Sequence, residues 1–301
     1  MKPQHTGALM VLASATGFAM LPIFIKLAYA LGANTITILT ARFILASLCL
    51  WGILRWRNLA AKVSRKTAIS LCLLGIAGYG LMSTFFAASL KYLPASMSSL
   101  LLYTYPAIVT LMSFLVGVDE FNWKKGLALV LSFCGLFLIL KVSFAGISLM
   151  GIMLGMASSL IYSAYLLVSS KVLKDVDPLV ATTYVCSAAA ITFTLTCAVT
   201  GEFVTTLPMA GWLILLAIAL VSTVVGILGC FAGIRLIGPA NTSIISTAEP
   251  VITVMLSVLL LAEKITPMQL GGGLLILSSI LILQLWAGGK ETATKVAESA
   301  S

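Results

Sequence analysis

The chain is dominated by repeated runs of about 20 apolar residues that contain almost no charge. A run of this length and composition is typical of a helix that crosses a lipid bilayer. Of the 301 residues, 60% are hydrophobic and only 9% are charged, whereas about a quarter are charged in an ordinary soluble domain. The sequence therefore excludes a soluble globular protein and predicts an all-α integral membrane protein.

Windows of about 20 apolar residues predict ten transmembrane helices. They cover residues 6–28, 34–56, 67–90, 95–117, 122–141, 146–171, 178–200, 209–234, 240–262 and 265–286. The linkers between them are short and rich in Gly, Pro, Asn and Asp, so they leave no room for a soluble domain. Residues 288–301 are polar, and we predict that they form a disordered cytoplasmic tail.

The basic residues predict how the chain is oriented. Most of them fall in segments that share one side of the membrane with the N-terminus, including a cluster after the second span at Arg55, Arg57, Lys62, Arg65 and Lys66. By the positive-inside rule, both termini are then expected in the cytoplasm. The net charge of +9 reflects this topology, so we expect no nucleic-acid partner, although the cluster could instead attract anionic lipid.

The sequence also contains an internal duplication with an offset of 144 positions. Without gaps, this offset aligns several identical residues, among them Pro106 with Pro250. We predict two five-helix repeats, at residues 1–145 and 146–287. Because five is an odd number, the second repeat enters the membrane from the opposite side, and the repeats are inverted. Inverted repeats are typical of alternating-access transporters, although a channel or a structural membrane protein could also arise by duplication.

Away from the ends of the predicted spans, Glu249 is the only acidic residue and Arg42 is the only basic one. A charge at this depth is costly unless it is paired or hydrated, so each is a candidate functional residue. Glu249 could receive a substrate ammonium group, carry a coupling proton, or join two helices by hydrogen bonds. Arg42 could bind a carboxylate or pair with Glu249, but a snorkelling or structural arginine needs neither. So few buried charges suit neutral, zwitterionic or amphipathic substrates better than nucleotides.

Prolines and tyrosines mark the middle of several spans. The fourth and ninth spans carry Pro106 and Pro250 near their centres, and we expect both helices to kink there, although packing curvature alone would also explain these prolines. The candidate cavity residues are five tyrosines well inside spans and one serine close to Glu249 and Pro250. They are Tyr79, Tyr103, Tyr105, Tyr162, Tyr165 and Ser246. An inward face rich in aromatic residues is equally typical of ordinary packing.

The two halves resemble the EamA unit of the drug/metabolite transporter superfamily. The second half carries the better match, Ala-Glu-Pro-Val at 248–251 and Leu-Leu-Ala-Glu-Lys-Ile-Thr at 260–266, and the first half has Leu-Tyr-Thr-Tyr-Pro at 102–106. The resemblance implies a basket of ten helices around a central cavity and export of small metabolites across the bacterial inner membrane. Since the first half has Tyr105 where the second has Glu249, any family role of the acid transfers only to Glu249.

Among the branches of this family, exporters of aromatic and other neutral amino acids fit the tyrosines and the sparse buried charge. Exporters of lipophilic drugs, nucleobase-like compounds or phosphorylated metabolites are the alternative. The small-molecule substrate would move by proton antiport or by facilitated diffusion. We expect a monomer or a weak dimer in the lipid bilayer.

The sequence lacks the usual motifs of catalysis and of ATP use. It has no G-x-x-x-x-G-K-[ST] loop, no H-E-x-x-H and no G-x-S-x-G, and its six cysteines lie singly in apolar stretches. We therefore expect neither a cofactor nor a metal site, and we expect that the protein is not an enzyme. An intramembrane enzyme that acts on lipid is the least favoured alternative, because it would need a nucleophile, base or metal site.

Overall fold

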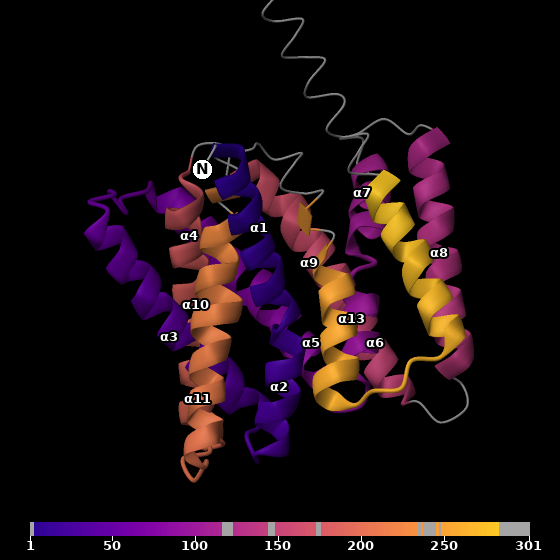
Figure 1. Ribbon diagram of the computed structural model, residues 1–301. Helices are drawn as coiled ribbons and strands as arrows, with labels where there is room; N and C mark the ends of the chain where they lie inside the picture. Colours follow the sequence, from indigo (N-terminus) through magenta and orange to yellow (C-terminus); the bar gives the residue numbers. More distant parts are fainter. Residues whose placement is uncertain are drawn as a thin grey trace, which may run out of the picture.

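The computed structural model describes residues 3–115, 123–143, 148–172, 176–230, 232–233, 236, 245–246 and 248–282, and the regular secondary structure of these residues is entirely helical. Within them, seven helices are long and apolar enough to cross a membrane, and three shorter apolar helices accompany them (Figure 1). The predicted all-α membrane fold is confirmed. The predicted tail, 288–301, lies outside the described residues.

The helices of the first half cover its five predicted spans. They are α1 (Pro3–Ala19), α2 (Leu21–Ala30), α3 (Thr35–Trp56), α4 (Arg65–Leu73), the π-helical segment η1 (Leu74–Gly80), α5 (Leu81–Ser89), α6 (Ala95–Leu102), α7 (Tyr105–Leu115) and α8 (Trp123–Ser143). The second half contains α9 (Leu149–Val172), α10 (Pro178–Thr200), α11 (Met209–Ala217), the π-helical segment η3 (Ile218–Val225), α13 (Ala248–Leu261) and a last helix, Pro267–Ile282.

Short polar side chains fix where several helices begin. Asn34, Ser64 and Asp177 precede α3, α4 and α10, and each side chain accepts a hydrogen bond from a backbone N–H of the first turn. Such caps satisfy donors that have no partner within the helix. At the other end of α10, Gly201 has a φ of 67°, a left-handed conformation that glycine adopts readily and that commonly ends a helix.

Proline interrupts the helical course of the first and fourth predicted spans. A turn at Met20 separates α1 from α2, and Pro22 lies in the first turn of α2. Pro22 lacks the N–H that would otherwise bond to the carbonyl of Phe18, which weakens the helix at this point. A continuous helix was predicted over residues 6–28, so this break differs from the prediction. Pro106 follows the junction between α6 and α7, whereas Pro250 lies at the start of α13.

The two π-helical segments occupy equivalent positions in the two halves. The offset of 144 positions moves η1 onto residues 218–224, which fall within η3. A π-helical turn inserts extra backbone into a helix and occurs frequently at functional sites. Hydropathy windows do not distinguish an α-helix from a π-helix, so the sequence predicted a continuous span in both places.

Helices from the two halves interleave instead of forming separate bundles. In the middle of the molecule, α3 packs against α10, its counterpart in the second half. Further contacts recur with the halves exchanged: α3 contacts η3 as α10 contacts η1, and α1 contacts α13 as α9 contacts α7. This exchange is expected for two repeats related by an approximate two-fold axis.

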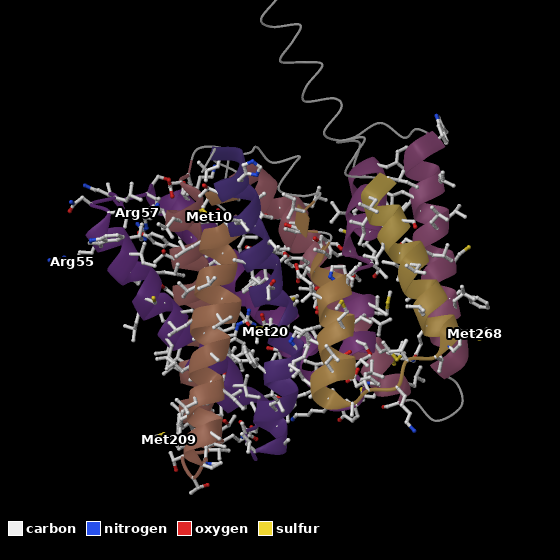
Figure 2. The ribbon with its side chains drawn as sticks, viewed as in Figure 1. Met10, Met20, Arg55, Arg57, Met209 and Met268 are labelled. Carbon is white, nitrogen blue, oxygen red and sulfur yellow. The ribbon has the colours of Figure 1, made fainter. Side chains whose placement is uncertain are left out.

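The outer faces of the helices carry large apolar side chains that are exposed in the protein alone. Leu48, Phe137 and Val199 are 66%, 64% and 86% exposed. A soluble protein rarely leaves so much apolar surface uncovered, but the hydrocarbon of a bilayer covers it. At the ends of the helices, Arg55 and Arg57 lie toward the end of the bundle where the chain begins, and Met209 lies at the opposite end (Figure 2).

Candidate substrate site

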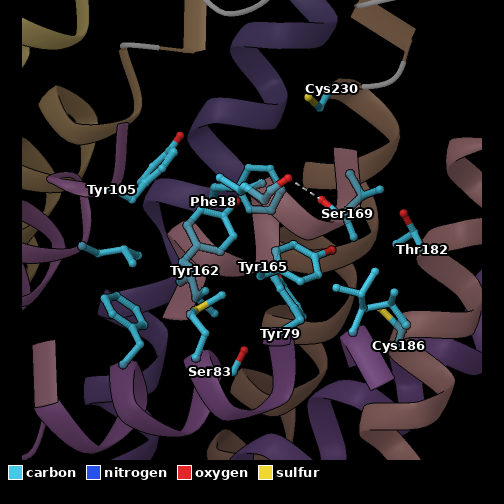
Figure 3. A pocket seen from close by; sticks show the side chains of 18 of the residues that line it. Phe18, Tyr79, Ser83, Tyr105, Tyr162, Tyr165, Ser169, Thr182, Cys186 and Cys230 are labelled. Atoms are coloured by element: carbon cyan, nitrogen blue, oxygen red, sulfur yellow. Dashed lines mark hydrogen bonds between the residues drawn. The ribbon is translucent and has the colours of Figure 1, made fainter. Parts of the chain in front are cut away.

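A cavity of about 410 Å³ lies between the two halves. Its walls come mainly from α2, η1, α5, α6, α9 and α10, and Figure 3 shows several of its side chains. Seven residues predicted from the sequence line it: Arg42, Tyr79, Tyr103, Tyr105, Tyr162, Tyr165 and Glu249. Ser246 does not line it, and Pro250 lines a smaller apolar cavity of about 190 Å³.

Arg42 is buried in the middle of α3, where only 2% of its surface is exposed. Its Nε donates to the hydroxyl of Thr223 at 3.0 Å, and its Nη2 donates to the hydroxyl of Tyr79 at 3.1 Å. The guanidinium carbon also lies 5.1 Å from the ring centre of Phe43 and 5.7 Å from that of Tyr79, which are cation–π distances. Arg42 is therefore held by neutral partners.

Glu249 lies at the start of α13, where its Oε1 accepts a hydrogen bond of 2.6 Å from the hydroxyl of Tyr103. This short hydrogen bond from Tyr103 fixes the carboxyl group at the cavity wall. Glu249 and Arg42, both in the described part of the chain, form no ion pair. The structure does not support the alternative in which Arg42 pairs with Glu249, because each has found a neutral partner instead.

Four tyrosines form a continuous aromatic wall. The ring centres of Tyr79 and Tyr165 are 5.8 Å apart, those of Tyr165 and Tyr162 are 5.9 Å apart, and those of Tyr162 and Tyr105 are 4.8 Å apart. The rings of Tyr162 and Tyr165 are nearly parallel, with 13° between their planes. Such a wall offers an apolar surface to a flat side chain and a hydroxyl at each ring tip. Tyr105, Tyr162, Tyr165 and Tyr79 are labelled in Figure 3.

Ser83 and Ser99 also line the cavity, and neither was predicted from the sequence as a site residue. The hydroxyl oxygens of Ser83 and Ser99 are buried and have no hydrogen-bond partner among the described residues. Buried polar groups normally have a partner in the protein or in solvent, so these two are available to a ligand or to water. Ser83 follows Tyr79 by four residues, one helical turn. Serine is too common in membrane helices for its sequence position to have predicted this.

The charges of the cavity are divided between the two repeats. With the offset of 144 positions, Arg42 corresponds to Cys186 and Glu249 corresponds to Tyr105, and all four residues line the cavity. The first repeat thus contributes the base and the second contributes the acid. The same offset pairs Tyr79 with Thr223, the two residues that bind Arg42. Applied residue by residue, this register could have predicted Thr223 from the sequence.

Comparison with known proteins agrees with this description. A model of the EamA-like transporter family matches the chain twice, at residues 5–141 and 149–285. A Synechocystis protein named uncharacterized transporter sll1319 is 26% identical over 204 residues, 65% of this chain and 60% of that protein. The Bacillus subtilis protein named uncharacterized transporter YcbK is 25% identical over 298 residues, 95% of this chain and 96% of that protein.

A solved crystal structure has the same fold. It matches with a TM-score of 0.67 at 16% sequence identity, and the match covers 94% of this chain and 99% of the other. The chain spans less than two thirds of the Synechocystis relative but nearly all of the Bacillus relative. The twofold family match confirms the resemblance seen in the sequence.

Proposed function

Because this chain belongs to the EamA-like transporter family and is thus a membrane transporter, we propose that it exports neutral amino acids, including aromatic ones, across the bacterial inner membrane. One observation carries the proposal: a single cavity presents an acid and a base that are not paired with each other, beside a wall of tyrosines. An amino acid offers a cation, an anion and a side chain to match. Its size also suits a cavity of about 410 Å³, within the usual range for small ligands.

Glu249 supports proton antiport as the means of energy coupling. A substrate ammonium group and a proton would compete for the same carboxylate, because protonation removes the charge that attracts the ammonium group. A proton that enters from outside would therefore displace the substrate, and a substrate bound from the cytoplasm would displace the proton. Alternating access of the two inverted repeats would carry both in turn.

The proposed orientation places both termini in the cytoplasm. It is supported by Arg55 and Arg57, which lie toward the same end of the bundle as the start of the chain (Figure 2). Since Arg42 is the one cation that lines the cavity among the described residues, sugar phosphates and nucleotides are less suitable cargo. We also propose a monomer or a weak dimer, because the charged groups of the site all come from one chain.

Counterflow in proteoliposomes tests the proposal. Vesicles are preloaded with unlabelled neutral amino acids, and accumulation of labelled phenylalanine, threonine or methionine is followed with and without a pH gradient. We expect saturable accumulation that other neutral amino acids block and that the gradient accelerates. If vesicles with folded protein accumulate no more labelled amino acid than vesicles without protein, the protein is not an amino-acid carrier. A conductance that does not saturate would indicate a channel.

Glu249→Gln tests the coupling step in the same vesicles. The variant keeps the shape of the side chain but cannot carry a negative charge or take up a proton, so the response to the pH gradient should disappear. Glu202→Gln is the matched control, because Glu202 is exposed at the end of α10 and outside the cavity. An unchanged gradient response in Glu249→Gln would contradict antiport through Glu249.

A further inference from the structure

Arg42 is a buried cation whose hydrogen-bond partners carry no charge. Both are hydroxyl groups, and within the described part of the chain no carboxylate forms an ion pair with it. A charge removed from water in this way is normally compensated by an opposite charge. Arg42 lines the cavity, so an anion that enters the cavity can supply that compensation.

The two hydroxyl partners orient the guanidinium group. Thr223 donates its own hydroxyl hydrogen to the carbonyl of Ile218 at 3.1 Å, which leaves its oxygen to accept from Arg42 Nε. Tyr79 accepts from Nη2. These bonds account for two of the five donors that a guanidinium group carries. The flat fork of the remaining donors matches the two oxygens of a carboxylate.

Thr223 and Tyr79 come from different repeats but from equivalent positions. Tyr79 lies in η1 and Thr223 in η3, and the offset of 144 positions superimposes one on the other. The π-helical turns therefore place one hydroxyl from each repeat against the same arginine. One turn beyond Tyr79 lies a further hydroxyl group, that of Ser83. It is buried, lines the cavity and has no hydrogen-bond partner among the described residues.

We propose that Arg42 binds the carboxylate of the transported substrate and that Thr223 and Tyr79 are the positioning residues that aim its guanidinium group into the cavity. Ser83, one turn beyond Tyr79, also lines the cavity and is a further donor for the carboxylate. The proposal rests on the proposed function, since it assigns one group of the amino acid to one end of the cavity. Glu249 and Tyr103 remain for the ammonium group.

Thr223 offers a matched set of variants. Thr223→Val has nearly the same shape and lacks the hydroxyl, whereas Thr223→Ser retains it. Thr183→Val is the control, because Thr183 is also fully buried but bonds to Leu179 of its own helix and does not line the cavity. Binding to the purified full-length protein is titrated with phenylalanine, with phenylalaninamide, which lacks the carboxylate, and with 3-phenylpropionate, which lacks the ammonium group.

We expect Thr223→Val to weaken the binding of phenylalanine and of 3-phenylpropionate about tenfold, the effect of one hydrogen bond to a charged group. The affinity for phenylalaninamide should not change. Thr223→Ser should restore the wild-type affinities, and Thr183→Val should leave all three unchanged. Tyr79→Phe removes the other acceptor, so it should likewise weaken the binding of phenylalanine and 3-phenylpropionate but not that of phenylalaninamide. This variant provides the test if Thr223→Val does not fold.

The outcomes separate this proposal from the proposed function. If Thr223→Val weakens the amide as much as phenylalanine, the hydroxyl acts on the fold and the carboxylate assignment is overturned. If the wild type binds 3-phenylpropionate in a manner that depends on Thr223 but does not bind phenylalanine, the carboxylate site stands and the amino-acid function fails. If the wild type binds none of the three probes, both proposals are wrong.

Discussion

Tyr103 is the residue on which the position of Glu249 depends. Its hydroxyl donates to Glu249 at 2.6 Å, and its ring is 8% exposed at the end of α6. Tyr103→Phe keeps the buried ring but removes the donor, so the carboxyl group is no longer held against the wall. We expect the KM for phenylalanine to rise about tenfold with little change in the maximal rate, measured as saturable counterflow.

Tyr29→Phe is the matched control for Tyr103→Phe. Tyr29 donates to the carbonyl of Ala87 at 2.8 Å and pairs with Thr35 at 2.9 Å, but it lies outside the cavity. Its loss should lower the thermal unfolding temperature and leave KM unchanged. Equal effects of the two variants on KM would contradict a specific role for Tyr103.

Single residues were predictable where chemistry alone makes them unusual. Glu249 and Arg42 were identified because a charge inside an apolar span is rare, and both line the cavity. Their roles in substrate binding stay predictions. Ser83 was not identified, because hydroxyl residues are common in membrane helices and only three-dimensional contacts distinguish it. Thr223 was missed because the repeat register was not applied to Tyr79. Ser246 was chosen for its place beside Glu249, but the cavity is lined by other residues.

Among the elements, η1 makes a very close contact with α10 of the other repeat. A Cβ added at Gly75 would lie 2.5 Å from the carbonyl oxygen of Val185 and 2.9 Å from the Cβ of Ala188. These atoms belong to a helix and cannot move aside easily. We expect Gly75→Ala to destabilise the protein by about 1–3 kcal/mol, as overpacking of a core does, and to lower its unfolding temperature in detergent.

Gly52→Ala is the control for this contact. Gly52 lies in α3, and a Cβ added there meets nothing within 4 Å. Alanine favours a helix over glycine by up to about 1 kcal/mol, so Gly52→Ala should be neutral or stabilising. A similar loss of stability in both variants would mean that the cost comes from helix propensity or from the detergent, and not from packing between η1 and α10.

The helical runs were predictable from the sequence, but their interruptions were not. Among the described residues, seven of the apolar runs form helices long enough to cross a membrane and three form shorter apolar helices, because burial in hydrocarbon demands length and apolarity alone. The turn at Met20 and the segments η1 and η3 were not expected. These interruptions depend on which backbone carbonyl groups lack the usual hydrogen bond from an N–H group one turn later, and on packing between the repeats. A hydropathy window contains no information on either.

At the scale of the whole molecule, a carboxylate of the second repeat joins the two repeats at one end of the bundle. Glu263 follows α13 and accepts hydrogen bonds from the backbone N–H groups of Ala95 and Ser96, at 2.5 Å and 3.1 Å, and from the Ser96 hydroxyl at 2.7 Å. These groups form the start of α6, where a negative charge is favourable. In Figure 1, α13 ends on the side of the bundle opposite the N-terminus.

This contact lies on the side opposite the N-terminus, and Ser99 and Leu102, further along α6, line the cavity. If the repeats separate there when the cavity opens, the contact between Glu263 and α6 must break, and weakening it should favour the open form. We expect Glu263→Gln to raise the rate at which a membrane-impermeant thiol reagent, added on that side, labels Cys230 in the cavity. The measurement uses a background in which the other cysteines are replaced, and a saturating substrate should slow the labelling.

Glu202→Gln is the control, because Glu202 is exposed in the loop before Met209, which lies at the same end of the bundle. It changes the charge of that end without touching α6, so its labelling rate should equal that of the unmodified background. If Glu202→Gln and Glu263→Gln raise the labelling rate equally, the change in rate comes from the surface charge that the reagent meets and not from the contact of Glu263 with α6. A faster rate in Glu263→Gln alone would identify the start of α6 as the place where the two repeats part.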